Sequence, residues 1–346
     1  MAIEFEKEIL HLRISDPTRD FEETILPFER RVDPLTRQTS IVYVARSRVP
    51  IGEPDIPGLI ERSLAVGCPF CPQAMDKFAM RFPTDLIPEG RIDLGESHVF
   101  AQVLPLAPYG AVIVLSSEHF IGLSDFTEGM LADGFSACQV YLQRVLEYDP
   151  GAKYHSILWN YMPPSGASQI HPHLQSLADY VPDNSLRELL EASQQYYQSN
   201  GTIFWSDLIA KEIELGERYI ASTGDVHWLC SFTPKMARGM DVIAIFQGRQ
   251  SLLDLSQQDL QHFSQGLQKV LRYMGDQHLY SFNLCLYSGI RAEDCFWTHA
   301  RIVPRVFGAL VDNSDVSTLQ LLLRRSFSFT PPEHICEQLR EYFQAL

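Results

Sequence analysis

The same order of expected elements occurs twice along the chain, and this repeat constrains the possible folds more than any other feature. Each copy has two strands, a helix with apolar residues at helical spacing, a further strand and a histidine-containing segment. In chain order, the two copies run through residues 100–115, 124–145, 154–160 and 166–175, and through 227–246, 256–274, 281–286 and 297–305. Matching positions are roughly 130 residues apart. The pattern predicts an α+β unit that has been duplicated.

The two units are expected to meet near residues 179–185, where Pro182, Asp183 and Asn184 interrupt regular structure. We therefore divide the chain into an N-terminal half, residues 1–182, and a C-terminal half, residues 183–346. The boundary is a prediction from turn-forming residues alone.

The charge of the chain excludes several classes of partner. The 346 residues carry a formal net charge of -15, which argues against a nucleic acid or an anionic membrane as the main partner. No apolar run approaches the roughly 18 residues that a membrane helix needs. The N-terminus, Met1-Ala-Ile-Glu-Phe-Glu, has no apolar core of a secretory signal. A soluble, cytoplasmic protein is expected.

The chain has seven cysteines, an odd number that argues against a disulfide framework. Only Cys68 and Cys71 are close in sequence. Such a Cys-x-x-Cys pair occurs in zinc sites and in redox sites, and the redox motif needs a thioredoxin-like βαβ context that this sequence does not show. Zinc needs two more ligands, and His119 and His171 are candidates because both follow strands of the first repeat.

The segment His171-Pro-His-Leu-Gln175 carries nitrogen-bearing side chains at alternate positions. In an extended strand, His171, His173 and Gln175 point to one side, which is costly to bury unless an anion or a metal lies there. The alternative is a polar strand that faces solvent. The preceding residues 165–168 are small and let the backbone approach a ligand, where its N–H groups can bind phosphate.

Histidine suits attack on phosphorus, because neutral imidazole is nucleophilic near neutral pH and the phosphoramidate that it forms can pass the group on. The Gln175 amide can donate to a phosphoryl oxygen without protonating it, which favours transfer over hydrolysis. The segment therefore offers a histidine suited to attack on phosphorus, with the Gln175 amide on the same face.

Taken together, these motifs resemble the galactose-1-phosphate uridylyltransferase branch of the histidine-triad superfamily, which also includes ADP-glucose and diadenosine-tetraphosphate phosphorylases. The motifs that match, in chain order, are Arg-x-Asp-Pro-Leu-Thr at 31–36, an Arg/Pro-rich stretch at 46–50, the zinc motifs at 68–71 and 116–119, an asparagine at 160, Gly-x-Ser at 166–168 and His-Pro-His-x-Gln at 171–175. The similarity covers roughly residues 30–180 and continues weakly through the second repeat.

The resemblance implies a nucleotidyltransferase of nucleotide-sugar metabolism, with an antiparallel sheet backed by a long helix in each half and with two copies in a homodimer. It implies that His173 becomes nucleotidylated while Gln175 supports the phosphoryl group. The residues that it implies for substrate binding are Asn160, Ser168, Arg46, Arg48 and Arg91. One structural zinc ion per chain, on Cys68, Cys71, His119 and His171, would hold the strand of His173 in place.

Two versions of the reaction stay open. In one, uridylyl passes between a UDP-hexose and a hexose 1-phosphate. In the other, inorganic phosphate cleaves an ADP-sugar or a dinucleoside polyphosphate. A non-catalytic nucleotide-binding relative is a third possibility. A zinc-dependent hydrolase is disfavoured, because four protein ligands would close the metal site to substrate.

The sequence departs from the family pattern at four places. One is the Leu- and Ser-rich segment 310–329, which differs from the segment that contacts the hexose in the uridylyltransferases. Leu174 replaces a glycine, which predicts a narrower space around the transferred phosphate. Residues 100–105 replace the segment that helps to hold uridine in the uridylyltransferases. In the second repeat, His299-Ala-Arg301 replaces a His-x-His metal motif, so no second metal is expected there.

Overall fold

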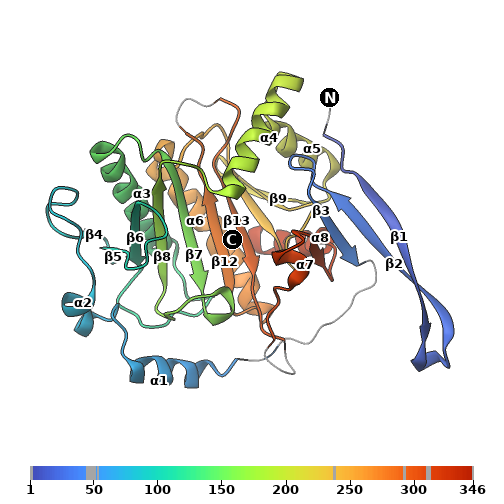
Figure 1. Ribbon diagram of the computed structural model, residues 1–346, viewed down its shortest axis with the longest axis horizontal. Coiled ribbons are helices and arrows are strands. Elements are labelled where there is room, and N and C mark those ends of the chain that lie inside the picture. The colour runs from blue at the N-terminus through green and yellow to red at the C-terminus, as the bar shows by residue number, and fades with distance from the viewer. Residues whose placement is uncertain are drawn as a thin grey trace.

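The computed structural model describes residues 3–43, 52, 54–236, 239–290, 294–308 and 313–344. Its centre is one sheet of ten strands (Figure 1). In spatial order these are β4 (Ile92–Leu94), β5 (Ser97–Ala101), β6 (Tyr109–Val114), β8 (His173–Asp179), β7 (Tyr154–Tyr161), β12 (Phe282–Tyr287), β13 (His299–Pro304), β11 (Val242–Phe246), β10 (Val226–Cys230) and β9 (Tyr219–Thr223). All neighbours in the sheet are antiparallel.

The strand order has an internal symmetry. From the outside inward, the first half runs β4-β5-β6-β8-β7 and the second runs β9-β10-β11-β13-β12. The halves meet where β7 pairs with β12, with Asn160 opposite Asn283. Without this pairing, each half would have an open sheet edge with unpaired backbone groups. The two sheets expected from the sequence are therefore joined into a single sheet.

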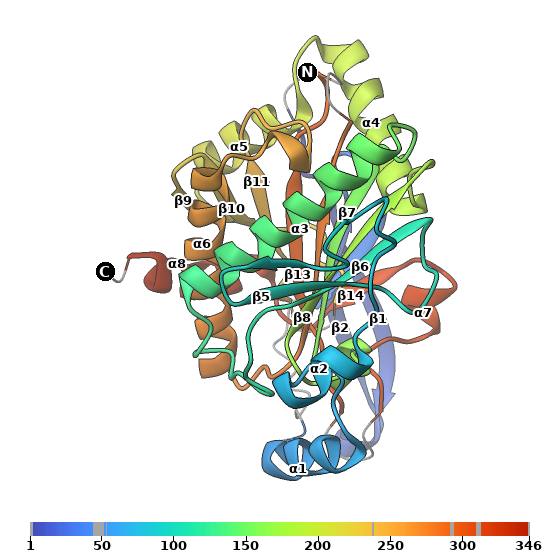
Figure 2. The same cartoon turned by 90° about the vertical axis from the view of Figure 1, so that its left-hand side faces the viewer.

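Two long helices, α3 (Glu128–Tyr148) and α6 (Gln257–Asp276), run side by side over one face of the sheet (Figure 2). Each begins where a hydroxyl caps the first turn: Thr127 accepts from the amide of Met130, and Ser256 forms a capping box with Asp259. Their apolar faces meet in the main core, where the rings of Phe135 and Phe263 are 5.0 Å apart. We call the opposite face of the sheet the outer face.

A smaller sheet lies beside the first and has the order β1-β2-β3-β14. Its strands are β1 (Lys7–Asp16), β2 (Glu22–Val32), β3 (Thr39–Tyr43) and β14 (Ser326–Ser328), and β1 and β2 form a ribbon that projects from the body (Figure 1). The remaining helices are α1 (Ile56–Val66), α2 (Pro72–Phe78), α4 (Asn184–Asn200), α5 (Phe204–Leu215), α7 (Thr318–Leu321) and α8 (Pro332–Gln344), with 3-10 turns η1 (Pro17–Arg19), η2 (Pro163–Ser165) and η3 (Leu252–Asp254).

The predicted α+β fold with a duplicated unit is confirmed, including the order of strands and helices in both repeats. The N-terminal ribbon and α5 lie outside the repeated pattern and were not predicted. The division at residues 182 and 183 stays a prediction; α4 begins directly after it, at Asn184. None of the described helices is long and apolar enough to cross a membrane.

Candidate functional site

The predicted nucleophile lies on the outer face, at the first residue of β8. His173 and Gln175 are half-buried, whereas Leu174 between them is fully buried. Leu174 belongs to the main core, and a side chain built on Gly134 of α3 would contact it at 3.5 Å. The expectation that Leu174 narrows the space around a phosphate is therefore wrong, because its side chain faces the helix layer.

The imidazole of His173 is held in one orientation. Its Nδ1 lies 2.8 Å from the carbonyl oxygen of His171, and its ring centre lies 5.2 Å from that of Phe70. Because a carbonyl oxygen can only accept, Nδ1 carries the hydrogen and Nε2 keeps its lone pair. Burial lowers the pKa of His173, so the neutral ring is favoured. This is the tautomer that a histidine nucleophile needs.

Gln175 points to the same side as His173, two residues along β8. Its Nε2 donates to Oε1 of Gln102 at 3.4 Å, and Gln102 in turn donates to the carbonyl oxygen of Leu104 at 2.6 Å. Gln102 therefore orients the Gln175 amide. It lies in the stretch that the sequence marked only as a departure from the family.

Asn160 approaches His173 from β7. Leu158 is opposite Gln175, so the same antiparallel register continued by two pairs brings Asn160 beside His173. Its Oδ1 accepts from Nδ2 of Asn283 at 2.6 Å, and that amide also donates to the carbonyl oxygen of Ser165 at 2.9 Å.

A charged group completes this chain of contacts. Nη1 of Arg305 donates to Oδ1 of Asn283 at 2.8 Å, and Asp315 accepts from Nε of Arg305 at 2.9 Å. Asn283 and Arg305 come from the second repeat, and sequence reasoning missed both. Their place at the site follows from the pairing of β7 with β12, and the spacing of residues in the sequence does not reveal that pairing.

Four predicted metal ligands lie together beside this strand. The ligand atoms of Cys68, Cys71, His119 and His171 are all within 4.8 Å of one another. Sγ of Cys71 is 3.2 Å from Nδ1 of His119 and 3.8 Å from Nδ1 of His171. A tetrahedral zinc ion would separate such sulfur and nitrogen ligands by about 3.6 Å. The donor set and its spacing therefore fit zinc.

Contacts behind the ligands orient both imidazoles. Nε2 of His171 lies 2.9 Å from the carbonyl oxygen of Ser116, and Nε2 of His119 lies 2.7 Å from Oγ of Ser63. The carbonyl oxygen requires a hydrogen on Nε2 of His171, which leaves Nδ1 free to bind a metal. Burial lowers the pKa of His171 to about 4 and, with Cys68 nearby, raises that of Cys71 to about 11.

The other predicted substrate ligands have different surroundings. Ser168 is exposed in the loop before β8, after Gly166, whose φ of 92° is a conformation that favours glycine. Arg91 is bound by Asp76 at 2.9 Å and by Asp93 at 3.0 Å, so its charge is already balanced. Arg46 and Arg48 lie outside the described residues.

The chain is similar to an Archaeoglobus fulgidus protein whose description is "uncharacterized protein". The two are 31% identical over 345 residues, which is 99% of this chain and 100% of the relative. No protein-family model matches the chain.

Solved structures share the fold at lower identity. A GalT-like protein from Arabidopsis thaliana and an ADP-glucose phosphorylase from Arabidopsis thaliana with bound ADP-glucose each superpose with a TM-score of 0.69 and 17% identity, over 90% of this chain and 98% of theirs. A uridylyltransferase superposes with a TM-score of 0.66 and 18% identity, over 91% of this chain and 98% of its own.

Proposed function

The chain belongs to one family with the Archaeoglobus fulgidus protein and has the GalT-like fold of the histidine-triad superfamily, and from this premise we propose that it is a nucleotidyltransferase that carries a nucleoside monophosphate on His173. The observation that carries the proposal is the contact between Nδ1 of His173 and the carbonyl oxygen of His171, at 2.8 Å. This contact leaves the lone pair of Nε2 available on the outer face of the sheet. The nitrogen lies at the start of β8, near Gln175 and Asn160.

The reaction proceeds through two displacements at phosphorus. Nε2 of His173 attacks the α-phosphorus of a nucleoside-diphospho substrate, the N–P bond forms, and the P–O bond to the leaving phosphate or sugar phosphate breaks. A phosphate oxygen of the acceptor then attacks the same phosphorus, and the N–P bond breaks. Nδ1 keeps its proton throughout and donates it to the carbonyl oxygen of His171, so the ring returns to its starting tautomer.

The neighbouring side chains have supporting roles. The Gln175 amide donates to a phosphoryl oxygen in both steps, and Gln102 keeps that amide oriented. Asn160, held by Asn283, positions the substrate beside His173. We propose that Ser168 contacts the phosphate and that Arg46 and Arg48 neutralise its charge. Arg91 is a weaker candidate for this role, because Asp76 and Asp93 already pair with it.

Cys68, Cys71, His119 and His171 would hold one zinc ion per chain. With four protein ligands the ion leaves no open position, so its contribution is structural. His171 would then link the metal to the nucleophile, because its side chain is a ligand and its carbonyl oxygen orients His173.

The first candidate substrate pair is a UDP-hexose with a hexose 1-phosphate. The second is an ADP-sugar or a dinucleoside polyphosphate with inorganic phosphate. The similarity to a structure with bound ADP-glucose supports the second pair, and the similarity to a uridylyltransferase supports the first. We further propose that two copies of the chain form a homodimer.

Intact-protein mass spectrometry tests the covalent step. The chain is incubated with UDP-glucose, ADP-glucose or diadenosine tetraphosphate, and the expected result is a mass increase of one nucleoside monophosphate with at least one of them. His173→Ala should remove the adduct. His11→Ala, at an exposed position of β1, is the matched control and should keep it.

The result that contradicts the proposal is equally specific. Substrates that raise the melting temperature of the chain without forming any adduct would indicate the non-catalytic nucleotide-binding relative. An adduct that persists in His173→Ala would show that another residue is the nucleophile.

A further inference from the structure

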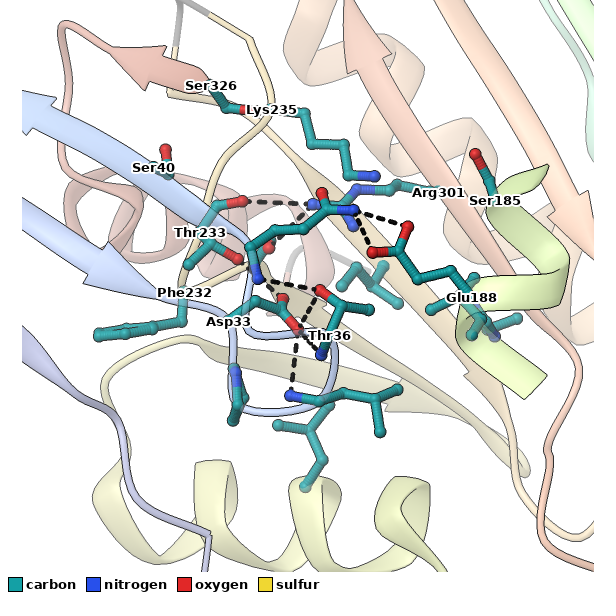
Figure 3. Close-up of a pocket in the computed structure, with 18 of the residues that line it drawn as sticks. Asp33, Thr36, Ser40, Ser185, Glu188, Phe232, Thr233, Lys235, Arg301 and Ser326 are labelled. Atoms are coloured by element: carbon teal, nitrogen blue, oxygen red, sulfur yellow. Dashed lines mark hydrogen bonds between the residues drawn. The ribbon is translucent and has the colours of Figure 1, made fainter. Parts of the chain in front are cut away.

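A pocket of about 320 Å³ lies on the outer face of the second half (Figure 3). Its floor is formed by β10, β11 and β13, and its walls by α4, α5 and the segments 33–40 and 320–326. Cavities of roughly 300–1,000 Å³ are typical of small-molecule sites. The function proposed above makes no use of this pocket.

His299 in the pocket has the same arrangement as His173. It is the first residue of β13, and its Nδ1 lies 3.0 Å from the carbonyl oxygen of Trp297, two residues earlier. The rings of Trp205 and Tyr287 stack on it, with centres at 4.0 Å and 5.2 Å. Burial lowers the pKa of His299 to about 3, so the ring is neutral. Its Nε2, which has no hydrogen-bond partner among the described residues, is a fixed acceptor.

Arg301 lies two residues further along β13, at the place that Gln175 has on β8. Its Nε and Nη2 donate to the buried carboxylate of Asp241 at 2.7 Å and 2.6 Å, and Nη2 also donates to Ser231 at 3.0 Å. Nη1 donates to none of the described residues. The guanidinium is thus rigidly held, with one of its amino groups left for a ligand.

Lys235 supplies a second cation (Figure 3). Its ammonium group forms no ion pair and no hydrogen bond with the described part of the chain. The charge of Arg301 and burial together lower the pKa of Lys235 to about 8, so it remains mostly protonated at neutral pH. Two cations side by side, one of them without a carboxylate partner, are unfavourable unless an anion joins them.

Three other carboxylates line the pocket, and none forms an ion pair with Lys235, although Asp33 and Glu188 favour its charged form from a greater distance. Glu212 accepts from Arg218 at 2.9 Å. Asp33 accepts from the amides of Leu35 and Thr36 and from the hydroxyl of Thr233. Glu188 accepts from Gln38 at 2.8 Å and from Arg324 at 2.6 Å. Asp33 and Glu188 are therefore engaged in holding the walls together.

We propose that this pocket is a second ligand site, separate from His173, for a small molecule with an oxyanion. The oxyanion, a phosphate or a carboxylate, binds Nζ of Lys235 and Nη1 of Arg301, and a donor group of the same molecule binds Nε2 of His299. A metal ion does not suit the pocket, because the two cations would repel it. Since β8 and β13 are antiparallel and three strand spacings apart, about 14 Å, the two sites lie at opposite ends of the outer face.

Calorimetric titration of the full chain carrying His173→Ala tests the proposal without turnover. The probes are inorganic phosphate, AMP and UMP as phosphates, and acetate and benzoate as carboxylates. At least one probe should bind, and Lys235→Met should weaken it at least tenfold. Lys153→Met removes an exposed lysine outside the pocket and should leave the affinity unchanged. The two groups of probes distinguish a phosphate ligand from a carboxylate ligand.

The stability of the ligand-free chain gives an independent readout. If Lys235 is kept unpaired for a ligand, Lys235→Met should raise the melting temperature, because it removes the repulsion with Arg301. If Lys235 had only a structural role, Lys235→Met would instead lower the melting temperature. His299→Gln should weaken the same probe while the adduct on His173 of the otherwise unchanged chain still forms. If no probe binds, or if its affinity is the same in Lys235→Met, the proposal is wrong.

Discussion

His173 and His299 begin two strands of one sheet, and each directs Nδ1 to the carbonyl oxygen of the residue two positions earlier, at 2.8 Å and 3.0 Å. Duplication has therefore preserved the backbone geometry that fixes a histidine tautomer. The surroundings differ. His173 lies beside Phe70 and the metal ligands, whereas the rings of Trp205 and Tyr287 stack on His299 in the pocket of the second half. In our proposals, the first half transfers a nucleotide at phosphorus and the second half binds a ligand.

The contact behind the metal site gives the first prediction. Ser63→Ala removes the hydroxyl that lies 2.7 Å from Nε2 of His119, and the loss of such an orienting partner typically weakens metal binding about 10- to 100-fold. Competition with a chromophoric zinc chelator measures the change. Ser15→Ala, at the end of β1, is the control. Equal zinc affinities in the two variants would show that the hydroxyl does not support the metal site.

Asn283 carries the second prediction, since it connects the two repeats at the site. Asn283→Ala leaves Oδ1 of Asn160 and the carbonyl oxygen of Ser165 without their donor, which should cost about 1–3 kcal/mol in the free energy of unfolding. We expect adduct formation on His173 to slow as well, because Asn160 loses its orientation. Single-turnover kinetics measure this. An unchanged rate would exclude the role of Asn160 in positioning the substrate.

Glu212 gives a prediction on pH. Its side chain is fully buried, Oε1 accepts from Arg218 at 2.9 Å, and Oε2 has no hydrogen-bond partner among the described residues. Burial outweighs the ion pair and raises the pKa from the ordinary 4.5 to about 7. Between these two pH values the folded chain keeps a proton that the unfolded chain has lost, so stability falls as pH rises.

The free energy of unfolding falls by at most about 1.4 kcal/mol per pH unit, and the fall ends above the pKa of Glu212 in the folded chain. In Glu212→Gln this contribution should be absent, so the difference in unfolding free energy between wild type and variant should change across pH 4.5–7 and be constant above it. Denaturant titrations at several pH values, without ligand, measure it. Parallel profiles for the two proteins would contradict the raised pKa.

Two glycines in the long helices predict opposite effects of the same change. A Cβ at Gly266 of α6 would lie 2.2 Å from the buried ring of Trp228, so Gly266→Ala should destabilise the fold by about 1–3 kcal/mol despite the better helix propensity of alanine. At Gly129 of α3 nothing lies within 4 Å, and Gly129→Ala should stabilise by up to about 1 kcal/mol. Thermal unfolding compares the two variants. A higher melting temperature in both would show that α6 can move away from the sheet.

Much of the fold could be predicted because it depends on short-range patterns. The helical spacing of Leu131, Phe135 and Leu142 and the alternation along β7 each report a buried face directly. The metal ligands could be predicted from chemistry, since two cysteines at close spacing need partners and both histidines follow strands. The projecting ribbon could not, because β1 and β2 lie outside the repeat and pack little of their surface.

By itself, the sequence determined which side chains of the strand share a face: His173 and Gln175 alternate with Leu174, so they point away from the core that Leu174 enters. Only the tertiary structure decided which residues meet those side chains. Asn283 reaches Asn160 across 123 residues of chain, and Lys235 comes to lie near Arg301 in a pocket lined by α4, α5 and residues 33–40. The physical reason is that strand pairing sets these contacts, and its register depends on the packing of the whole sheet rather than on any local run of residues.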